Sequence, residues 1–125
     1  MRLLLDTHIY LWVLLDSPKL NKTAKKMIMD ADEVYVSSVS IWEASIKLSL
    51  GKLDIDMSLL SMDISVFGYA ELPVRFNHSL MVAKLPHIHK DPFDRLLVAQ
   101  AMSEPLNFLT SDRLLAGYSE LVLTV

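Results

Sequence analysis

Short, mostly apolar segments alternate along this chain with longer segments of helical spacing, and this alternation restricts the possible folds most strongly. The apolar segments are residues 3–5 (LLL), 33–38 (EVYVSS), 70–74 (AELPV) and 106–111 (LNFLTS), and a last segment, 121–125 (LVLTV), could add an edge strand. Runs of this kind are typical of strands that are buried on both faces of a sheet.

The intervening segments are expected to be helices. They cover residues 7–15, 21–30, 40–50, 57–67, 77–85 and 91–103, and three of them stop at Gly51, Gly68 and Pro86. Strands that alternate with helices imply a parallel sheet with helices on both faces. We therefore predict an α/β protein with a three-layer α/β/α fold and a central parallel sheet of four to five strands.

The overall composition limits the class of protein. The chain has 125 residues and no linker-like stretch, which predicts one domain over residues 1–125, and it has no cysteine for a disulfide or a thiolate metal site. No apolar stretch approaches the ~20 residues of a membrane span, so we predict a cytoplasmic protein with no membrane partner. The net charge of −3 argues against broad adhesion to nucleic acid, and any such contact must be local.

Acidic residues stand where the predicted strands end. Asp6 directly follows the first strand, and Asp112 follows the fourth. Glu43 lies near the start of the helix after the second strand, and Asp94 lies in the first turn of the helix that begins at Asp91. Because the carboxyl ends of parallel strands share one edge, where ligands bind in open α/β folds, we expect the four acids to converge there.

Helix capping is the simpler interpretation of each acid taken alone. Asp91 precedes a proline as an N-cap does, Ser40 and Glu43 could form a capping box, and Ser111 or Asp112 could cap the segment that follows. Capping needs only an acceptor, however, and Ser, Thr or Asn would serve as well. It therefore does not explain acids at all of these positions.

Converging carboxylates need a cation. Two carboxylates about 5 Å apart repel each other by about 3 kcal/mol at an effective dielectric constant near 20, so such a cluster either protonates in part or holds a cation. Oxygen ligands without cysteine or an organised histidine set favour Mg²⁺, with Mn²⁺ possible, over zinc. A divalent ion that attracts phosphate and activates water suits phosphodiester hydrolysis.

Four motifs occur in order over nearly the whole chain: LLLDTHIYLW, VSSVSIWEASIKLSLGKL, HKDPFDRLLVAQA and LTSD. Together they resemble the PIN-domain family, and specifically the VapC-type toxins of prokaryotic type II toxin–antitoxin systems. The resemblance implies a PIN-like fold and a Mg²⁺-dependent endoribonuclease that is a homodimer and is neutralised by an antitoxin, whose C-terminal segment enters the site. It places the catalytic and metal-binding acids on Asp6, Glu43, Asp94 and Asp112.

Many relatives carry a further acid just beyond the position of Asp112, where this chain has Arg113 and Leu114. This difference bears on whether the site holds one ion or two. A non-catalytic PIN-fold module that binds protein or RNA is the alternative to the nuclease. A phosphotransfer receiver or a haloacid-dehalogenase-type phosphatase is disfavoured, because the segment DTH lacks the second acid of an Asp-x-Asp pair.

Four residues are secondary candidates for the site. Asp91 could assist a second ion or a water molecule, although capping explains it fully. Thr7 and Ser111 could hydrogen-bond a carboxylate or a bound water, and Arg95 could belong to a local basic track for RNA.

Two further features leave alternatives open. His87 and His89 precede the helix that begins at Asp91 and could contact phosphate or shuttle a proton, or they could simply be surface residues. The helix expected after Asp6 is apolar on nearly all sides, which indicates full burial or cover by a second chain. Tyr10 and Trp12 make this helix the first candidate for a dimer or antitoxin contact.

Overall fold

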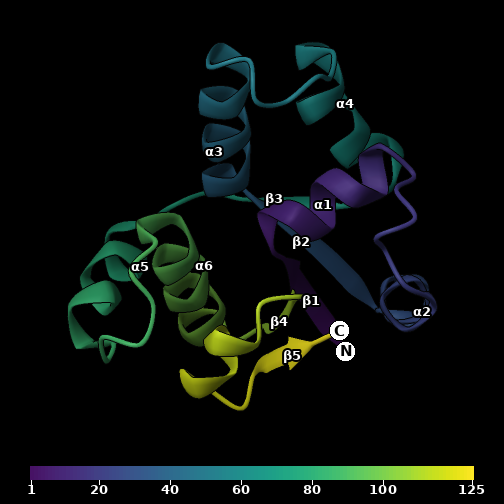
Figure 1. The fold of residues 1–125 in the computed structure, drawn as a ribbon. Coiled ribbons are helices and arrows are strands. Elements are labelled where there is room, and N and C mark those ends of the chain that lie inside the picture. The colour runs from purple at the N-terminus through teal and green to yellow at the C-terminus, as the bar shows by residue number, and fades with distance from the viewer.

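The computed structural model describes the side chains of residues 1–62 and 64–125, and its centre is a five-stranded sheet (Figure 1). The strands in chain order are β1 (Arg2–Leu5), β2 (Glu33–Ser37), β3 (Ala70–Leu72), β4 (Asn107–Thr110) and β5 (Val122–Thr124). Their order across the sheet is β3-β2-β1-β4-β5, and every neighbouring pair is parallel. The predicted parallel sheet is confirmed, and the last apolar segment forms its edge strand.

Helices cover both faces of this sheet, with α1 and α2 on one side and α5 and α6 on the other (Figure 1). The α-helices are α1 (Thr7–Leu14), α2 (Lys22–Asp30), α3 (Ser38–Ser49), α4 (Met57–Val66), α5 (Phe76–Met81) and α6 (Pro92–Ser103). Two short 3₁₀ helices are η1 (Val82–Lys84) and η2 (Arg113–Gly117). The three layers are those predicted from the alternation of segments.

The central strand β1 supplies both hydrophobic cores. Leu4 packs in a cluster with Leu97 of α6 and Phe108 of β4. Leu3 and Leu5 point to the opposite face and belong to a second cluster with residues of α1 and α2. Successive side chains of a strand alternate between faces, so a wholly apolar run is what a strand between two helical layers requires.

The start of α3 differs from the sequence prediction. The helix begins at Ser38, and the N-cap is Ser37, whose Oγ accepts a hydrogen bond from the Val39 amide at 3.0 Å. Ser40 is therefore inside the helix and buried, where its Oγ accepts a hydrogen bond from Thr7 Oγ1 at 2.9 Å. The predicted capping box of Ser40 and Glu43 is wrong, because β2 passes directly into α3 without a loop.

Two other segments have boundaries that differ from the predicted ones. The helix expected over residues 77–85 begins at Phe76 and changes from α to 3₁₀ geometry after Met81. The strand expected over residues 70–74 ends at Leu72, just before Pro73, and proline cannot donate to a strand ladder.

Burial within the chain explains why α1 is apolar on nearly all sides. Ile9, Tyr10 and Leu11 are buried, and Tyr10 Oη donates to the carbonyl oxygen of Leu60 in α4 at 2.7 Å. Trp12 is half-buried and packs against the α1 and α2 cluster. Of the two alternatives, cover by a second chain is therefore not needed to account for this helix. No described helix combines the length and apolar character that crossing a membrane requires.

Candidate metal centre

Asp6 leaves β1 and begins α1 at the carboxyl edge of the sheet. Its Oδ1 accepts a hydrogen bond from the Thr7 amide and its Oδ2 accepts one from Thr110 Oγ1, both at 2.7 Å. The residue is buried. Burial raises the pKa of Asp6 above its ordinary value, while the hydrogen bonds from Thr110 and Thr7 act in the opposite direction. The site thus contains a buried carboxyl group that is fixed in one orientation.

Glu43 reaches the same edge from the second turn of α3, and its two oxygens differ. Oε2 lies 3.1 Å from Lys47 Nζ. Oε1 is buried and has no hydrogen-bond partner among the described residues. A buried acceptor without a partner is costly, and an anionic oxygen in that position is suited to a cation.

Asp94 lies in the first turn of α6, which Asp91 caps by accepting from the Phe93 and Asp94 amides at 2.8 and 3.2 Å. Burial raises the pKa of Asp94 to about 8, with further increases from the negative charges of Asp6, Asp91, Glu43 and Asp112. The charges of all three other predicted acids therefore contribute to the raised pKa of Asp94. Without a cation, most molecules would carry a proton on Asp94 at neutral pH.

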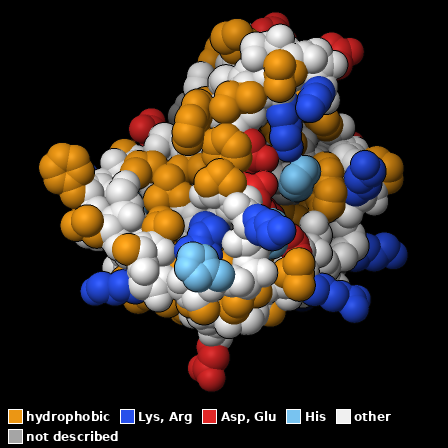
Figure 2. Space-filling model, turned by 60° about the vertical axis from the view of Figure 1, so that its left-hand side comes forward, with side chains coloured by type: hydrophobic (Ala, Val, Ile, Leu, Met, Phe, Trp, Pro, Cys, Tyr) orange, Lys and Arg blue, Asp and Glu red, His pale blue; other side chains and the backbone are white. Residues whose placement is uncertain are grey.

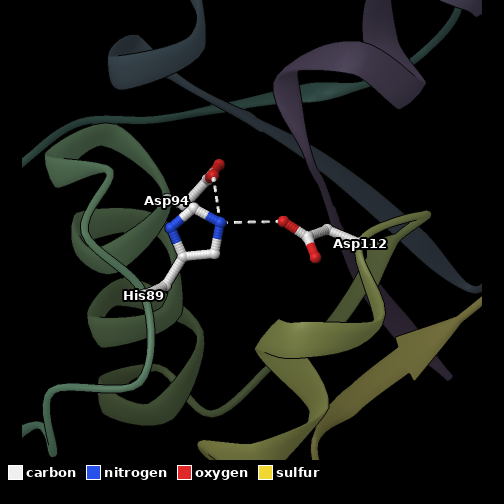
Figure 3. Close-up of side chains that lie close together, drawn as sticks. All are labelled: His89, Asp94 and Asp112. Atoms are coloured by element: carbon white, nitrogen blue, oxygen red, sulfur yellow. Dashed lines mark hydrogen bonds and ion pairs between the residues drawn. The ribbon is translucent and has the colours of Figure 1, made fainter.

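Asp112 joins the cluster through His89 (Figure 3). His89 Nε2 lies 2.9 Å from Asp112 Oδ2 and 3.7 Å from Asp94 Oδ2. One ligand atom from each of these three residues lies within 4.8 Å of the others, a spacing compatible with a metal ion. Asp112 also caps η2, because its Oδ1 accepts from the Leu114 amide at 3.0 Å.

The hydroxyl group that contacts Asp6 is not one of the two named from the sequence, Thr7 and Ser111. Ser111 is exposed, and the hydroxyl that contacts Asp6 belongs to the preceding residue, Thr110. Thr110 is the last residue of β4, and Ser111 follows it outside the strand. Thr7 contacts Ser40 through its hydroxyl and Asp6 through its amide.

Arg95 holds the scaffold together rather than standing free beside the acids. Its guanidinium donates to the carbonyl oxygen of Pro86 at 2.9 Å, to Tyr118 Oη at 3.0 Å and to the carbonyl oxygen of Val82 at 3.3 Å. These contacts tie α6 to the segment before it and to the end of η2. Arg95 therefore has a structural role, and its place in a basic track for RNA stays a prediction.

The acids are recessed in a hollow with mixed borders. Figure 2 shows acidic side chains near the centre of one face, with hydrophobic side chains on their left and basic or histidine side chains to their right and below. Trp42 and Phe93, each one residue before a site acid, form an edge-to-face pair with ring centroids 4.9 Å apart. Lys47 Nζ lies 3.5 Å from His8 Nε2. Positive and aromatic groups thus adjoin the carboxyl groups.

The fold is that of a parallel α/β protein, and the carboxyl edge of its sheet carries an acidic site that is suited to a cation. A family model described as PIN domain matches residues 3–121, and the chain belongs to the PIN-domain family, as its four motifs predicted. Several solved structures are similar in fold, and two of them are described next. No curated protein matches the sequence significantly.

The first similar structure is VapBC2 from Rickettsia felis bound to a DNA fragment from their promoter. It has a TM-score of 0.68 and 12% identity, with 100% of this chain and 98% of that chain covered. The second is FitAB bound to IR36 DNA fragment, with a TM-score of 0.63, 17% identity and coverage of 88% of this chain and 85% of that chain. At these identities the likeness concerns the fold.

The hydrogen bond from Thr110 to Asp6 leads to a first prediction. We expect Thr110→Val to lower the free energy of unfolding by roughly 1–3 kcal/mol, because it leaves a buried carboxyl oxygen without its donor. Urea unfolding of the metal-free protein at neutral pH measures this change. Thr110→Ser keeps the hydroxyl and is the matched control. A valine variant as stable as the serine variant would show that the bond contributes little.

Proposed function

We propose that this protein is a Mg²⁺-dependent endoribonuclease of the VapC type and that residues 1–125 act as one PIN unit. The acids proposed to hold the ion and to carry catalysis are Asp6, Glu43, Asp94 and Asp112, and Mn²⁺ is expected to replace Mg²⁺. The observation that supports this most strongly is the gathering of buried carboxyl groups at one edge of the sheet. Burial, followed by the charges of the neighbouring acids, raises the pKa of Asp94 to about 8.

The residues present fit a hard divalent ion. Their ligand atoms are carboxylate oxygens, the type that Mg²⁺ prefers, and the buried Glu43 Oε1 lacks a hydrogen-bond partner among the described residues. When bound, the ion would neutralise the carboxylates, attract a phosphodiester and promote ionisation of a water molecule.

Neighbouring residues hold the acids in orientations that are suited to binding a cation. The hydroxyl of Thr110 and the amide of Thr7 fix the orientation of Asp6, so little ordering remains to be done when a ligand binds. Lys47 occupies Oε2 of Glu43 and leaves Oε1 open. Lys47 and His8 also place basic groups beside the acids, which supports a local RNA contact despite the net charge of −3.

Apolar surface beside the site supports the proposed protein partners. A groove of about 540 Å³ lies between α3 and α4, and its lining includes Ile41, Trp42 and Tyr69. Trp42 is 59% exposed, and Phe76 and Leu80 of α5 are also exposed. Exposed aromatic and aliphatic side chains are typical of interfaces. We propose a cognate antitoxin and a second copy of the chain as the partners, in the cytoplasm.

RNA cleavage by the purified protein tests this function. We expect an end-labelled single-stranded RNA to be cut in Mg²⁺ and to stay intact in EDTA, and we expect Asp6→Asn and Glu43→Gln to lose the Mg²⁺-dependent products. Asp30→Asn is the matched control, because Asp30 is an exposed acid on α2 that pairs with Lys26. If wild type and the two site variants behave identically, the alternative of a non-catalytic binding module gains the support.

A further inference from the structure

His89 lies among the site acids without being one of them (Figure 3). It precedes α6 by three residues, and its ring is directed at the carboxyl groups of Asp112 and Asp94, at 2.9 and 3.7 Å from Nε2. Its side chain is 19% exposed. A histidine in this position could be a metal ligand or a hydrogen-bond donor. A ligand needs a lone pair on Nε2, the nitrogen that faces the acids, whereas a donor needs a hydrogen on it.

The hydrogen bond at Nδ1, on the other side of the ring, indicates which nitrogen carries the hydrogen. The backbone N–H of Asp91 donates to His89 Nδ1 at 3.0 Å, so Nδ1 presents its lone pair. A neutral imidazole has one N–H, which must then be on Nε2. That N–H faces Asp112 and has no lone pair for a cation. The local backbone therefore favours a donor and disfavours a ligand.

The backbone of His89 is fixed as firmly as its ring. Its N–H donates to Tyr118 Oη at 2.8 Å, and the same hydroxyl accepts from Arg95 Nη1 at 3.0 Å. Tyr118 follows η2, which begins directly after Asp112, and Arg95 follows Asp94 in α6. The segment that carries His89 is thus tied to both elements that supply its acidic neighbours.

We infer that His89 is a positioning residue, a donor through its Nε2–H that orients Asp112 beside Asp94, and that it is not a ligand of the ion. The inference rests on the proposed function only in assuming that these acids hold a metal. An ionised carboxylate has about four acceptor sites, so Asp112 keeps room for a cation while it accepts from His89 and from the Leu114 amide. Donors that orient metal-binding carboxylates commonly govern affinity in this way.

The protonated nitrogen can be observed without any turnover. In ¹⁵N-labelled, metal-free protein near pH 8, we expect long-range proton–nitrogen spectra to show His89 with its hydrogen on Nε2, unchanged by added Mg²⁺. The signals are assigned by their loss in His89→Gln. His78 is an internal reference, because its Nδ1 likewise accepts from a backbone amide, that of Arg75, at 3.0 Å. A His89 ring with its hydrogen on Nδ1, with or without Mg²⁺, would overturn the inference.

Mn²⁺ binding, measured by the electron paramagnetic resonance signal of the free ion, tests the orienting role. We expect His89→Ala to weaken Mn²⁺ binding by roughly 10–100-fold, whereas His89→Gln stays close to wild type because its amide N–H can still reach Asp112. Equal loss in both variants would indicate a ligand, and no loss in either would exclude positioning.

The two failures can be told apart. If folded wild-type protein binds no Mn²⁺, the proposed function fails, whereas the nitrogen spectra still decide whether His89 is a donor. Thermal unfolding followed by circular dichroism shows whether each variant is folded, and the glutamine variant keeps the comparison valid if the alanine variant is not.

Discussion

Asp94→Asn is expected to lower the rate of Mg²⁺-dependent RNA cleavage by roughly 10²–10³-fold, because a bound divalent ion supplies several kcal/mol of charge stabilisation and Asn is a poor substitute for an anionic ligand. The same change is expected to make the metal-free protein more stable near pH 8. Asn removes an ionisable group that burial and neighbouring carboxylates hold in an unfavourable environment. Loss of activity with a gain in stability is the trade-off expected where an active site contains a destabilising group.

Asp91→Asn is the control for this variant. It removes one negative charge three residues away, and Asn is as good an N-cap as Asp, so we expect α6 to form and most of the cleavage rate to remain. RNA cleavage assays and urea unfolding are run on both variants and on wild type. An Asp94→Asn variant that cuts RNA as fast as wild type, or that is less stable than wild type without metal, would contradict the proposed role of Asp94.

The second large effect is a fall in the stability of the metal-free protein as pH rises. The pKa of Asp94 is about 8 in the folded protein, against an ordinary value of 3.8. Between these values the folded state keeps a proton that the unfolded state has released, so rising pH favours unfolding. The favourable contribution of this group is complete below about pH 4 and is lost as pH rises through about 8. The pKa of Asp6 is also raised by burial, in the same direction.

Urea unfolding in EDTA at several pH values between about 5 and 9 measures this dependence. We expect Asp94→Asn to show a much flatter profile than wild type. Added Mg²⁺ should restore stability, and more so near pH 8 than near pH 5, because the ion and the proton compete for the same carboxyl oxygens. Parallel profiles for wild type and Asp94→Asn would show that the pKa of Asp94 is not raised.

The sheet and the position of its acids were predictable because both follow from local chain geometry. A run such as Leu3–Leu5 has no polar side chain to turn toward water, so it belongs between two helical layers. Once the strands are parallel, a residue directly after a strand must lie at the carboxyl edge, which is how Asp6 and Asp112 were placed there. The resemblance to PIN domains added the fold, and the family match agrees with it.

The residues that support the acids were not predictable in the same way. Thr110 reaches Asp6 from 104 positions away, and this contact depends on β1 pairing with β4, an order that single-sequence patterns do not specify. The contact between His89 and Asp112 was not predictable either, because it depends on where the fold places the segment that follows β4. The contacts of Arg95 with two carbonyl oxygens and Tyr118 were not predictable either, because the fold sets these partners.

The most direct test of the metal centre is a crystal structure of the protein with MnCl₂, with diffraction recorded at the manganese absorption edge. The anomalous signal should show an ion held by the carboxylates of Asp6, Glu43, Asp94 and Asp112, with His89 in contact with Asp112 and not with the ion. Crystals saturated with Mn²⁺ that show no ion at this edge of the sheet, or that show these side chains turned away from one another, would contradict the account.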